Sequence, residues 1–335
     1  MKNSLWKLYR LIGLGVWYSF GTERLLTPPF IYHIEPTDRC NYSCSFCYHG
    51  YPSLSSQRPS GFLTIENFSK IVEEMDSLKP MRRYLALSLG GEPLLHKDFP
   101  DMVRIANEKG FRPLFASNGR LLLPEVTDRL VRAGQWHAMI DFSSIPEVFD
   151  KHRGGRGDFE IVLKNLRYLV SVVKEYPHTH SVSLMDMSHY GGKYRDGTLD
   201  DIRSLFPSEL PRNIAFGKVD FHNACGLLGA NFEKKMYRIC PYPWVQMAIA
   251  WNGDVVACCR DIEGKTILGN VLKNSIMEIW RSKTYVLFRK NLRNRKPEKN
   301  AACARCDMPW SSGSRRWKLS YILSLLLGDT FRKKK

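Results

Sequence analysis

The feature that most constrains how this chain can fold is a regular alternation of strand-like and helix-like segments between residues 30 and 221. Thr64 and Pro124 are positioned to begin helices, and Gly110 and Gly134 are positioned to end them. Strands joined through helices run parallel, and right-handed connections curl such a sheet into a full or partial barrel. The predicted strands cover residues 30–35, 84–89, 112–116, 136–142, 181–187 and 213–221, and the predicted helices cover 64–78, 99–109, 124–134, 159–175 and 199–206.

Several residues that can carry chemistry follow these strands directly. In parallel barrels the carboxyl ends of the strands meet at one face, and active sites are built there. The residues at these positions are three cysteines after the first strand, Gly90-Gly91-Glu92 after the second, Ser117-Asn118-Gly119 after the third, and Asp141 in the fourth. We therefore expect one functional site at this face.

The three cysteines form the motif Cys40-x3-Cys44-x2-Cys47. Thiolates this close in the chain are expected to bind one common metal centre. Three soft sulfur ligands can hold three irons of a four-iron–four-sulfur cluster and leave the fourth iron open to another ligand. A zinc site with a distant fourth ligand and three unrelated buried thiols remain the alternatives.

With Phe46 directly before the last cysteine, this loop resembles the cluster loop of the radical S-adenosylmethionine (radical SAM) superfamily. The resemblance implies that Cys40, Cys44 and Cys47 hold a 4Fe-4S cluster whose fourth iron binds S-adenosyl-L-methionine. It also implies that one electron cleaves SAM to methionine and a 5′-deoxyadenosyl radical, which removes a hydrogen atom from the substrate. Phe46 is then expected beside the adenine.

The same resemblance assigns contacts with SAM to two of the loops that follow strands. Gly90, Gly91 and Glu92 are expected to line the methionine end of SAM, with Glu92 near its amino group and the glycines allowing close approach of the main chain. Ser117 and Asn118 resemble the Thr-Asn of a Thr-Asn-Gly found after the third strand in the family. A plain turn explains them equally well.

Two further residues are expected toward the ribose of SAM. Asp141 falls where the family places an acidic residue. The family often has a serine two residues before it, but Met139 stands there in this chain, so Ser143 is the candidate replacement. His33 on the first strand is expected either to face the barrel interior or to be a satisfied core residue.

Six of the nine cysteines follow residue 222, and four of them form a second set. Cys240, the spacing Gly253-x4-Cys258 and the pair Cys303-x2-Cys306 resemble the auxiliary-cluster region of SPASM and Twitch proteins. The resemblance implies one auxiliary 4Fe-4S cluster in a Twitch-like form, because six thiols cannot complete two four-cysteine clusters. A structural zinc ion held by the same four cysteines is the alternative.

The two remaining cysteines carry weaker expectations. Cys259 adjoins Cys258 and is predicted to be a buried small apolar residue. Cys225 is predicted to be structural, with a substrate-side thiol or a spare ligand as alternatives.

These features predict an α/β protein: a partial (β/α)6 TIM-like barrel followed by a smaller C-terminal α+β cluster-binding domain. In the second domain, strands at 244–250 and 255–258 flank the hairpin turn Asn252-Gly253, and a helix is predicted over 275–292. The expected divisions are an N-terminal amphipathic segment at 1–27, the radical SAM barrel at 28–222, the auxiliary cluster domain at 223–312 and a basic amphipathic tail at 313–335.

The formal net charge of +17 favours anionic partners, and aromatic and basic residues at both ends make an anionic membrane surface a candidate. Short cysteine spacings suit metal ligation in a reducing compartment better than disulfides. We therefore expect a cytoplasmic protein whose termini can contact the inner surface of the membrane. Nucleic acid is not an expected partner, whereas an electron donor such as flavodoxin or ferredoxin is.

For the activity, the resemblance favours a radical SAM oxidoreductase that dehydrogenates an alcohol or sugar-like substrate, with the auxiliary cluster as electron acceptor. The alternative enzyme matures a peptide. Many peptide-modifying relatives carry a recognition domain before the barrel, and only residues 1–29 precede the first strand here. A zinc-stabilised basic binding protein is the alternative that is not an enzyme. The sequence names neither the substrate nor the proton acceptor.

Overall fold

The computed structural model describes residues 22–51, 58–79, 84–155, 157–187, 198–218, 223–227 and 236–310. The chain divides into two compact units, which we describe one at a time. The parallel-sheet unit comprises residues 34–69 and 84–221, and the hairpin unit comprises residues 1–33, 70–83 and 222–335. Of the predicted N-terminal segment 1–27 only residues 22–27 are described, and they form no helix; the predicted tail 313–335 lies outside the described residues.

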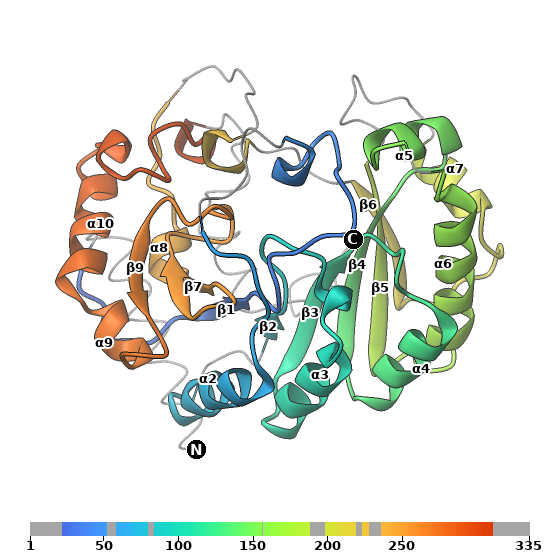
Figure 1. The fold of residues 1–335 in the computed structure, drawn as a ribbon, viewed down its shortest axis with the longest axis horizontal. Helices are drawn as coiled ribbons and strands as arrows, with labels where there is room; N and C mark the ends of the chain where they lie inside the picture. The colour runs from blue at the N-terminus through green and yellow to red at the C-terminus, as the bar shows by residue number, and fades with distance from the viewer. Residues whose placement is uncertain are drawn as a thin grey trace. The chain divides into compact units, whose positions relative to one another are not determined.

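Five parallel strands form the sheet of the parallel-sheet unit, in the order β6-β5-β4-β3-β2 (Figure 1). Buried and half-buried residues alternate along β4 and β5, because successive side chains of a strand point to opposite faces. The strands are β2 (Tyr84–Ala86), β3 (Arg112–Ser117), β4 (Trp136–Phe142), β5 (His180–Asp186) and β6 (Ile214–Lys218). The first predicted strand is β1 (Ile31–Ile34), at the boundary between the units.

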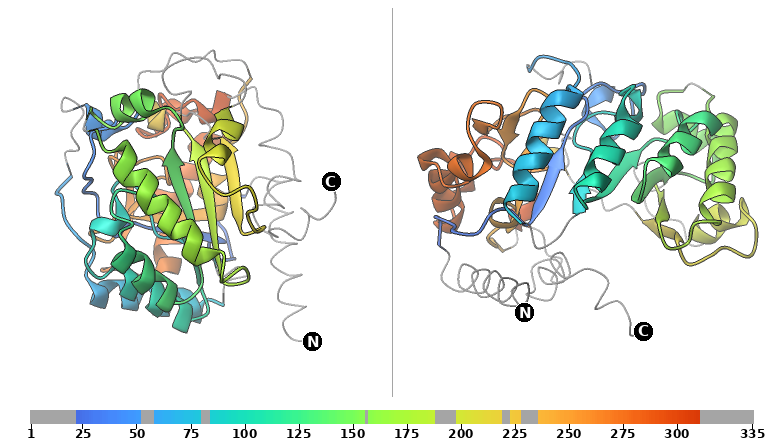
Figure 2. Two further views of the ribbon diagram at one scale, coloured as in Figure 1. Left: turned by 90° about the vertical axis from the view of Figure 1, so that its right-hand side faces the viewer. Right: turned by 90° about the horizontal axis from the view of Figure 1, so that it is seen from below.

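Helices alternate with these strands along the chain, as predicted. They are α3 (Phe99–Glu108), α4 (Pro124–Arg132), α5 (Pro146–His152), α6 (Phe159–Val173) and α7 (Thr198–Ser204), of which α5 was not predicted. Figure 2 shows α3, α4 and α6 along one side of the sheet. The apolar residues of α6 recur at helical spacing, and Val162, Leu166, Leu169 and Val173 are fully buried. Burial of this stripe fixes the helix on the sheet.

The predicted stop signals coincide with backbone that an L-residue rarely adopts. Gly110 follows α3 with φ +72°, and Gly134 follows α4 with φ +118°. Glycine populates positive φ at little steric cost, so each residue ends its helix and turns the chain toward the next strand.

The hairpin unit holds residues 31–33 of β1 and an antiparallel meander of β7 (Gln246–Ile249), β8 (Asp254–Val256) and β9 (Ile267–Asn270). Gly253 lies in the predicted turn between β7 and β8 with φ +85°. The helices that contribute to this unit are α2 (Ile65–Ser77), α8 (Tyr242–Val245), α9 (Ile276–Trp280) and α10 (Lys283–Arg293). Short 3-10 turns occur at Tyr48–Gly50, Pro93–Leu95, Ala224–Gly226, Pro297–Lys299 and Met308–Trp310.

Two predictions for this unit are wrong in detail. The strand predicted over 244–250 begins only at Gln246, because residues 242–245 form the short helix α8. The helix predicted over 275–292 is two helices, α9 and α10. The break falls where Ser282 adopts extended backbone and its hydroxyl accepts a hydrogen bond from the amide of Tyr285 at 3.1 Å, which caps a new helix.

A buried arginine anchors the segment before β1 to the hairpin unit. Arg289 donates hydrogen bonds to the carbonyl oxygens of Glu23, Pro243 and Trp280 at 2.8–3.0 Å. Its guanidinium also lies 4.1 Å from the ring centres of Trp280 and Tyr285. Segments far apart in the sequence are thus joined by one side chain.

Within the described ranges, no helix combines the length and apolar character needed to cross a bilayer. Contact of the termini with a membrane surface remains a prediction, since those segments lie outside the described residues.

Candidate functional site

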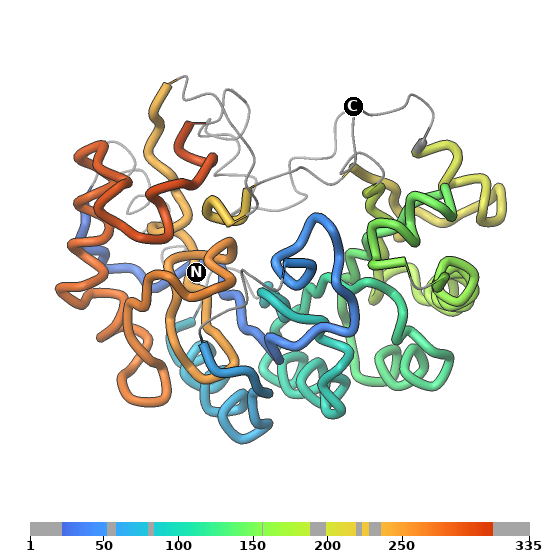
Figure 3. Tube along the Cα trace, turned by 45° about the horizontal axis from the view of Figure 1, so that its top comes forward, coloured from blue at the N-terminus to red at the C-terminus, as the bar shows by residue number. Residues whose placement is uncertain are grey.

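The predicted iron ligands Cys40, Cys44 and Cys47 lie in the loop after β1, in the parallel-sheet unit; Figure 3 draws this loop in blue. Cys44 is buried and the other two are half-buried. The amide of Cys47 donates to the carbonyl oxygen of Cys44 at 3.0 Å, and the amide of Gly50 donates to that of Cys47 at 2.9 Å. Any side chain at Gly50 would collide with the backbone of Cys44. The loop is therefore a tight coil that requires glycine at its end.

Glu92 joins this loop to the loops after β2 and β3. Its carboxylate accepts hydrogen bonds from the Ser117 hydroxyl at 2.9 Å and from the amides of Leu94 and Asn118 at 3.1 and 2.8 Å. Its own amide donates to the carbonyl oxygen of Arg39 at 2.8 Å. Burial raises the pKa of Glu92 to about 7, even though these three donors oppose the shift.

Gly90 and Gly91 permit close approach of the second loop to the segment that leads into the cysteines. A Cβ on Gly91 would overlap the carbonyl oxygens of Thr37 and Arg39, and one on Gly90 would lie 2.9 Å from a carboxylate oxygen of Glu35. The sequence predicted close approach to SAM. The structure describes close approach to the chain itself, which is a sufficient reason for both glycines; their contact with SAM remains a prediction.

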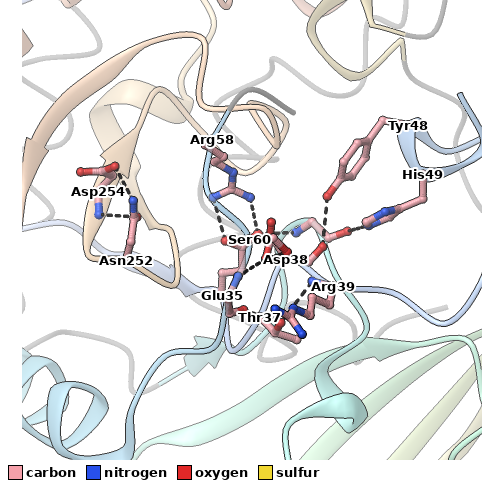
Figure 4. Close-up of polar contacts among 12 residues, drawn as sticks. Glu35, Thr37, Asp38, Arg39, Tyr48, His49, Arg58, Ser60, Asn252 and Asp254 are labelled. Carbon is pink, nitrogen blue, oxygen red and sulfur yellow. Dashed lines mark hydrogen bonds and ion pairs between the residues drawn. The ribbon is translucent and has the colours of Figure 1, made fainter. Parts of the chain in front are cut away.

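A buried ion pair supports the same junction (Figure 4). The Glu35 carboxylate pairs with both terminal nitrogens of Arg58 at 2.7 and 2.8 Å, and it also accepts from the amide of Gly90 at 3.0 Å. The Glu35 side chain is fully buried and that of Arg58 is 9% exposed. On the other side, His49 Nε2 lies 3.0 Å from the carbonyl oxygen of Gly90. Side chains before and after the cysteine loop thus hold Gly90 from two directions.

Asparagine side chains link the cysteine loop to β3. The Asn118 side-chain nitrogen donates to Asn41 Oδ1 at 2.8 Å, directly after Cys40. On the next residue, the Tyr42 hydroxyl donates to Asp158 at 3.0 Å, and Arg120 pairs with the same carboxylate at 3.2 Å. Of the two predicted residues, Asn118 therefore lies beside the cysteine loop, and Ser117 contacts Glu92.

Arg153, directly after α5, brings a buried positive charge into contact with the first cysteine set. One terminal nitrogen lies 3.3 Å from Cys44 Sγ, and the other donates to the carbonyl oxygen of Asp141 at 2.7 Å. The guanidinium is 5.7 Å from the centre of the Phe46 ring and 5.5 Å from that of Tyr42. Arg153 is 3% exposed, so its charge acts on the sulfur with little screening by water.

The structure describes the surroundings of the residues that are predicted to contact the adenosine part of SAM, namely Asp141, Ser143 and Phe46. Asp141 lies on β4, and burial raises its pKa while Arg153 opposes the shift. Ser143 is fully buried, and its hydroxyl accepts from the amide of Ile145 at 3.3 Å. Phe46 packs edge-on against His152 at 5.7 Å between ring centres. Their contacts with SAM stay predictions.

The second cysteine set converges in the hairpin unit. Cys240, Cys258, Cys303 and Cys306 line one cavity, together with Arg260 and several apolar side chains. The described residues contain no three His, Cys, Asp or Glu side chains gathered closely enough for a single metal ion. The four thiols are spread around the cavity instead. A cubane cluster has four irons, each bound by its own thiolate, so this donor set fits the predicted auxiliary cluster.

Burial is the largest cause of a raised pKa for four of the thiols, Cys40, Cys47, Cys240 and Cys303. It raises the pKa of Cys40 to about 12 and that of Cys47 to about 11. It also raises the pKa of Cys240 and Cys303, and in both cases neighbouring cysteines add to the shift. Thiols of this kind bind iron only when they lose their protons, so cluster assembly must release protons at both sites.

Cys225 lines the same cavity as a fifth cysteine. Its thiol hydrogen-bonds with those of Cys258 and Cys306; these bonds raise the pKa of Cys225, and the bond with Cys306 lowers the pKa of Cys306.

Cys259 is not part of the lining, and its sulfur accepts from the side chain of Gln246 at 3.4 Å. The same Gln246 lies 3.1 Å from His33 Nε2, and burial lowers the pKa of His33 to about 4. His33 therefore has a hydrogen-bonding partner within its own unit.

Sequence reasoning missed Glu35, Arg58 and Arg153. Glu35 carried a usable signal, because it is a carboxylate at the end of an otherwise apolar strand-like run. Arg58 and Arg153 carried none, since each is one of the many basic residues of a chain with a net charge of +17.

The fold and the two cysteine sites together define an iron–sulfur enzyme built on a parallel α/β unit. Residues 34–196 match the radical SAM superfamily, and residues 240–307 match SPASM, an iron-sulfur cluster-binding domain. The chain belongs to the radical SAM superfamily and carries a SPASM domain. Both matches lie inside the predicted domains 28–222 and 223–312, whose boundaries remain a prediction.

Two characterised relatives illustrate the range of the family. The chain is 30% identical over 130 residues to Fe-coproporphyrin III synthase of Methanosarcina barkeri; that match covers 39% of this chain and 31% of the synthase. It is 26% identical over 316 residues to the mycofactocin maturase MftC of Mycolicibacterium smegmatis; that match covers 85% of this chain and 77% of the maturase.

Solved structures confirm the fold. BtrN in complex with AdoMet and 2-DOIA superposes with a TM-score of 0.57 at 19% identity, covering 83% of this chain and 92% of BtrN. Streptococcus suis SuiB bound to its precursor peptide SuiA superposes with a TM-score of 0.51 at 16% identity, covering 79% of this chain and 67% of SuiB. The predicted α/β fold is confirmed. The cofactors of such an enzyme are SAM, the 4Fe-4S cluster that binds it, and an auxiliary iron–sulfur cluster.

Proposed function

We propose that this enzyme matures a peptide by radical chemistry. The observation that carries the proposal is the long match to the mycofactocin maturase, which covers 85% of this chain. The likeness to SuiB, a protein solved with a bound precursor peptide, supports it. The sequence favoured dehydrogenation of an alcohol or sugar-like substrate and kept the peptide as the alternative. The comparisons favour that alternative.

When bound, the cluster and SAM supply a 5′-deoxyadenosyl radical that removes a hydrogen atom from the substrate. In this chain, Cys40, Cys44 and Cys47 would hold three irons of that cluster. Arg153 would place a buried positive charge against the ligand sulfur of Cys44, 3.3 Å away. Glu92, with Ser117 and the amide of Asn118, would fix the loops that shape the surroundings of SAM.

The second set, Cys240, Cys258, Cys303 and Cys306, would hold the auxiliary cluster. Four cysteines complete a cubane and leave no iron open, so this cluster would carry electrons rather than bind SAM. An oxidised peptide product requires that an electron leave the substrate after the hydrogen atom. The auxiliary cluster is the proposed acceptor, and flavodoxin or ferredoxin is the proposed donor to the first cluster.

The test is an anaerobic assay of the cluster-loaded chain with SAM and a reductant. We would offer short peptides encoded beside its gene in one arm and secondary alcohols of the aminocyclitol type in the other. If the enzyme matures a peptide, adding that peptide should stimulate the formation of 5′-deoxyadenosine. The amount of peptide whose mass changes should then equal the amount of 5′-deoxyadenosine formed.

The control is the same chain with Cys40, Cys44 and Cys47 all replaced by alanine, which should form no 5′-deoxyadenosine with any substrate. If an alcohol is oxidised to a ketone while every peptide stays unchanged, the proposal is wrong and the enzyme is an alcohol dehydrogenase.

A further inference from the structure

The second site holds one cysteine more than its cluster needs. Five sulfurs line the cavity, those of Cys225, Cys240, Cys258, Cys303 and Cys306. A cubane takes four thiolates. The SPASM match begins at residue 240 and includes the other four, so Cys225 is the thiol left over.

The backbone of Cys225 indicates that neighbouring contacts fix this residue in its position. Ala224 and Cys225 both adopt left-handed backbone, with φ +44° and +58°. Residues with a Cβ are strained there and keep such a conformation only where neighbouring contacts enforce it. The side chain of Cys225 is nevertheless buried in the cavity rather than turned to solvent.

Those contacts come from the loop that carries Cys303 and Cys306. The side-chain nitrogen of Asn223 donates to the carbonyl oxygen of Arg305 at 2.8 Å, and its side-chain oxygen accepts from the amide of Asp307 at 3.2 Å. In return, the amide of Asn223 donates to the Asp307 carboxylate at 3.2 Å. Asn223 is 1% exposed, so these reciprocal bonds form away from water.

Close backbone packing completes the clamp. Any side chain at Gly226 would collide with Arg305. Asp307 also pairs with Arg260 at 3.5 Å, and Arg260 lines the cavity. The segment 223–226 is thus fixed against the cysteine pair, and this sets the Cys225 thiol beside Cys258 and Cys306.

We propose that Cys225 is a fifth sulfur of the auxiliary site, that its single S–H proton is shared in a hydrogen bond with the ligand sulfurs of Cys258 and Cys306, and that this bond raises the reduction potential of the auxiliary cluster. Hydrogen bonds to cluster sulfurs are one of the main determinants of potential, because they stabilise the more negative, reduced state. A higher potential makes the cluster a better acceptor of an electron. The inference depends on a cluster at the second site and not on the identity of the substrate.

The experiment is a redox titration of the cluster-loaded, full-length chain, followed by electron paramagnetic resonance. The chain with Cys40, Cys44 and Cys47 replaced by alanine identifies which reduction step belongs to the second cluster. Cys225→Ala should move that step to a more negative potential while the second site keeps about four irons. Cys225→Ser, which retains a donor on the same strained backbone, should restore part or all of the shift.

Cys259→Ala is the matched control, since Cys259 adjoins Cys258 but lies outside the cavity lining. It should leave the potential unchanged. An unchanged potential in Cys225→Ala would overturn the proposal and make Cys225 a packing residue. Loss of the second cluster's iron in Cys225→Ala would also overturn it, because Cys225 would then be a ligand. Neither result would bear on whether the substrate is a peptide.

Discussion

A terminal nitrogen of Arg153 lies 3.3 Å from the sulfur of Cys44, and both residues are buried. The guanidinium is fixed by a second hydrogen bond, to the carbonyl oxygen of Asp141 at 2.7 Å. A positive charge so close to a ligand sulfur stabilises the negative charge that a bound cluster brings. We therefore regard Arg153 as a positioning residue for the first cluster, tied at once to the cysteine loop and to β4.

Replacing Arg153 with methionine should slow reductive cleavage of SAM. A hydrogen bond to a charged group contributes about 1.5–3 kcal/mol, which corresponds to roughly a tenfold effect or more on the rate. The measurement is 5′-deoxyadenosine formation with excess reductant, at equal iron content. Arg153→Lys keeps the charge but loses the two-pronged geometry, so an intermediate rate is expected. A methionine variant with the wild-type rate and wild-type first-cluster potential would contradict the role.

Alanine at Cys40, Cys44 or Cys47 should abolish SAM cleavage but leave the second cluster in place. The two cysteine sets belong to different units and share no ligand. Iron content should fall by about half, from roughly eight to roughly four per chain. Iron and sulfide analysis, combined with the yield of 5′-deoxyadenosine, checks both parts. Undiminished 5′-deoxyadenosine in these variants would exclude the loop as the cluster site.

The converse applies to Cys303→Ala or Cys306→Ala. Iron should again fall by about half, and the first cluster should still cleave SAM without substrate, but product should no longer form. Because the ligands come from three separate segments, loss of the metal should also loosen the region after residue 223. Limited proteolysis compares this region between variant and wild type. Full iron content with normal turnover would remove these cysteines as ligands.

The alternation of apolar runs was enough to predict most of the fold. The strand predicted over 136–142 coincides with β4, and the helix predicted over 99–109 differs from α3 by one residue. These elements are encoded by local periodicity and by glycine and proline at their ends. The helix predicted over 275–292 failed because Ser282 is a capping residue inside a continuous apolar pattern. A pattern of helical period shows where a helix can form, not where a cap divides it.

The candidate site was predictable where the chain keeps its residues close together. The first cysteine loop is one short motif, and its neighbours Glu92, Ser117 and Asn118 lie at or just after the ends of the adjacent strands β2 and β3. The place of Cys225 in the cavity could not be predicted, because its segment is held there by contacts with residues about 80 positions away, such as Asn223 with Asp307. Pairings of that range are set by tertiary packing and leave no local trace in the sequence.

The buried pair of Glu35 and Arg58 predicts a clear asymmetry between single and double substitutions. Removing one partner leaves an unpaired buried charge, so Arg58→Met should lower the free energy of unfolding by about 3–5 kcal/mol. Glu35→Gln together with Arg58→Met should cost much less than the sum of the single changes. Denaturant unfolding of the cluster-loaded wild type, the two single variants and the double variant gives the free energies for this double-mutant cycle. Equal, additive costs would mean that the pair contributes no coupling at this junction.

Glu92 should make stability fall as the pH rises toward neutrality. Its folded-state pKa of about 7 lies above the ordinary value of 4.5, because burial disfavours the carboxylate. Between these two values the folded state binds the extra proton, so its stabilisation is fully present below about pH 4.5 and is lost as the pH rises through 7. The loss has an upper bound of about 3 kcal/mol. Melting temperatures of wild type and Glu92→Gln, compared between pH 5 and pH 7.5, isolate this group because glutamine does not titrate. As the pH rises, the wild type should lose stability relative to the glutamine variant. A constant difference in melting temperature across that range would show that Glu92 is already ionised at pH 5.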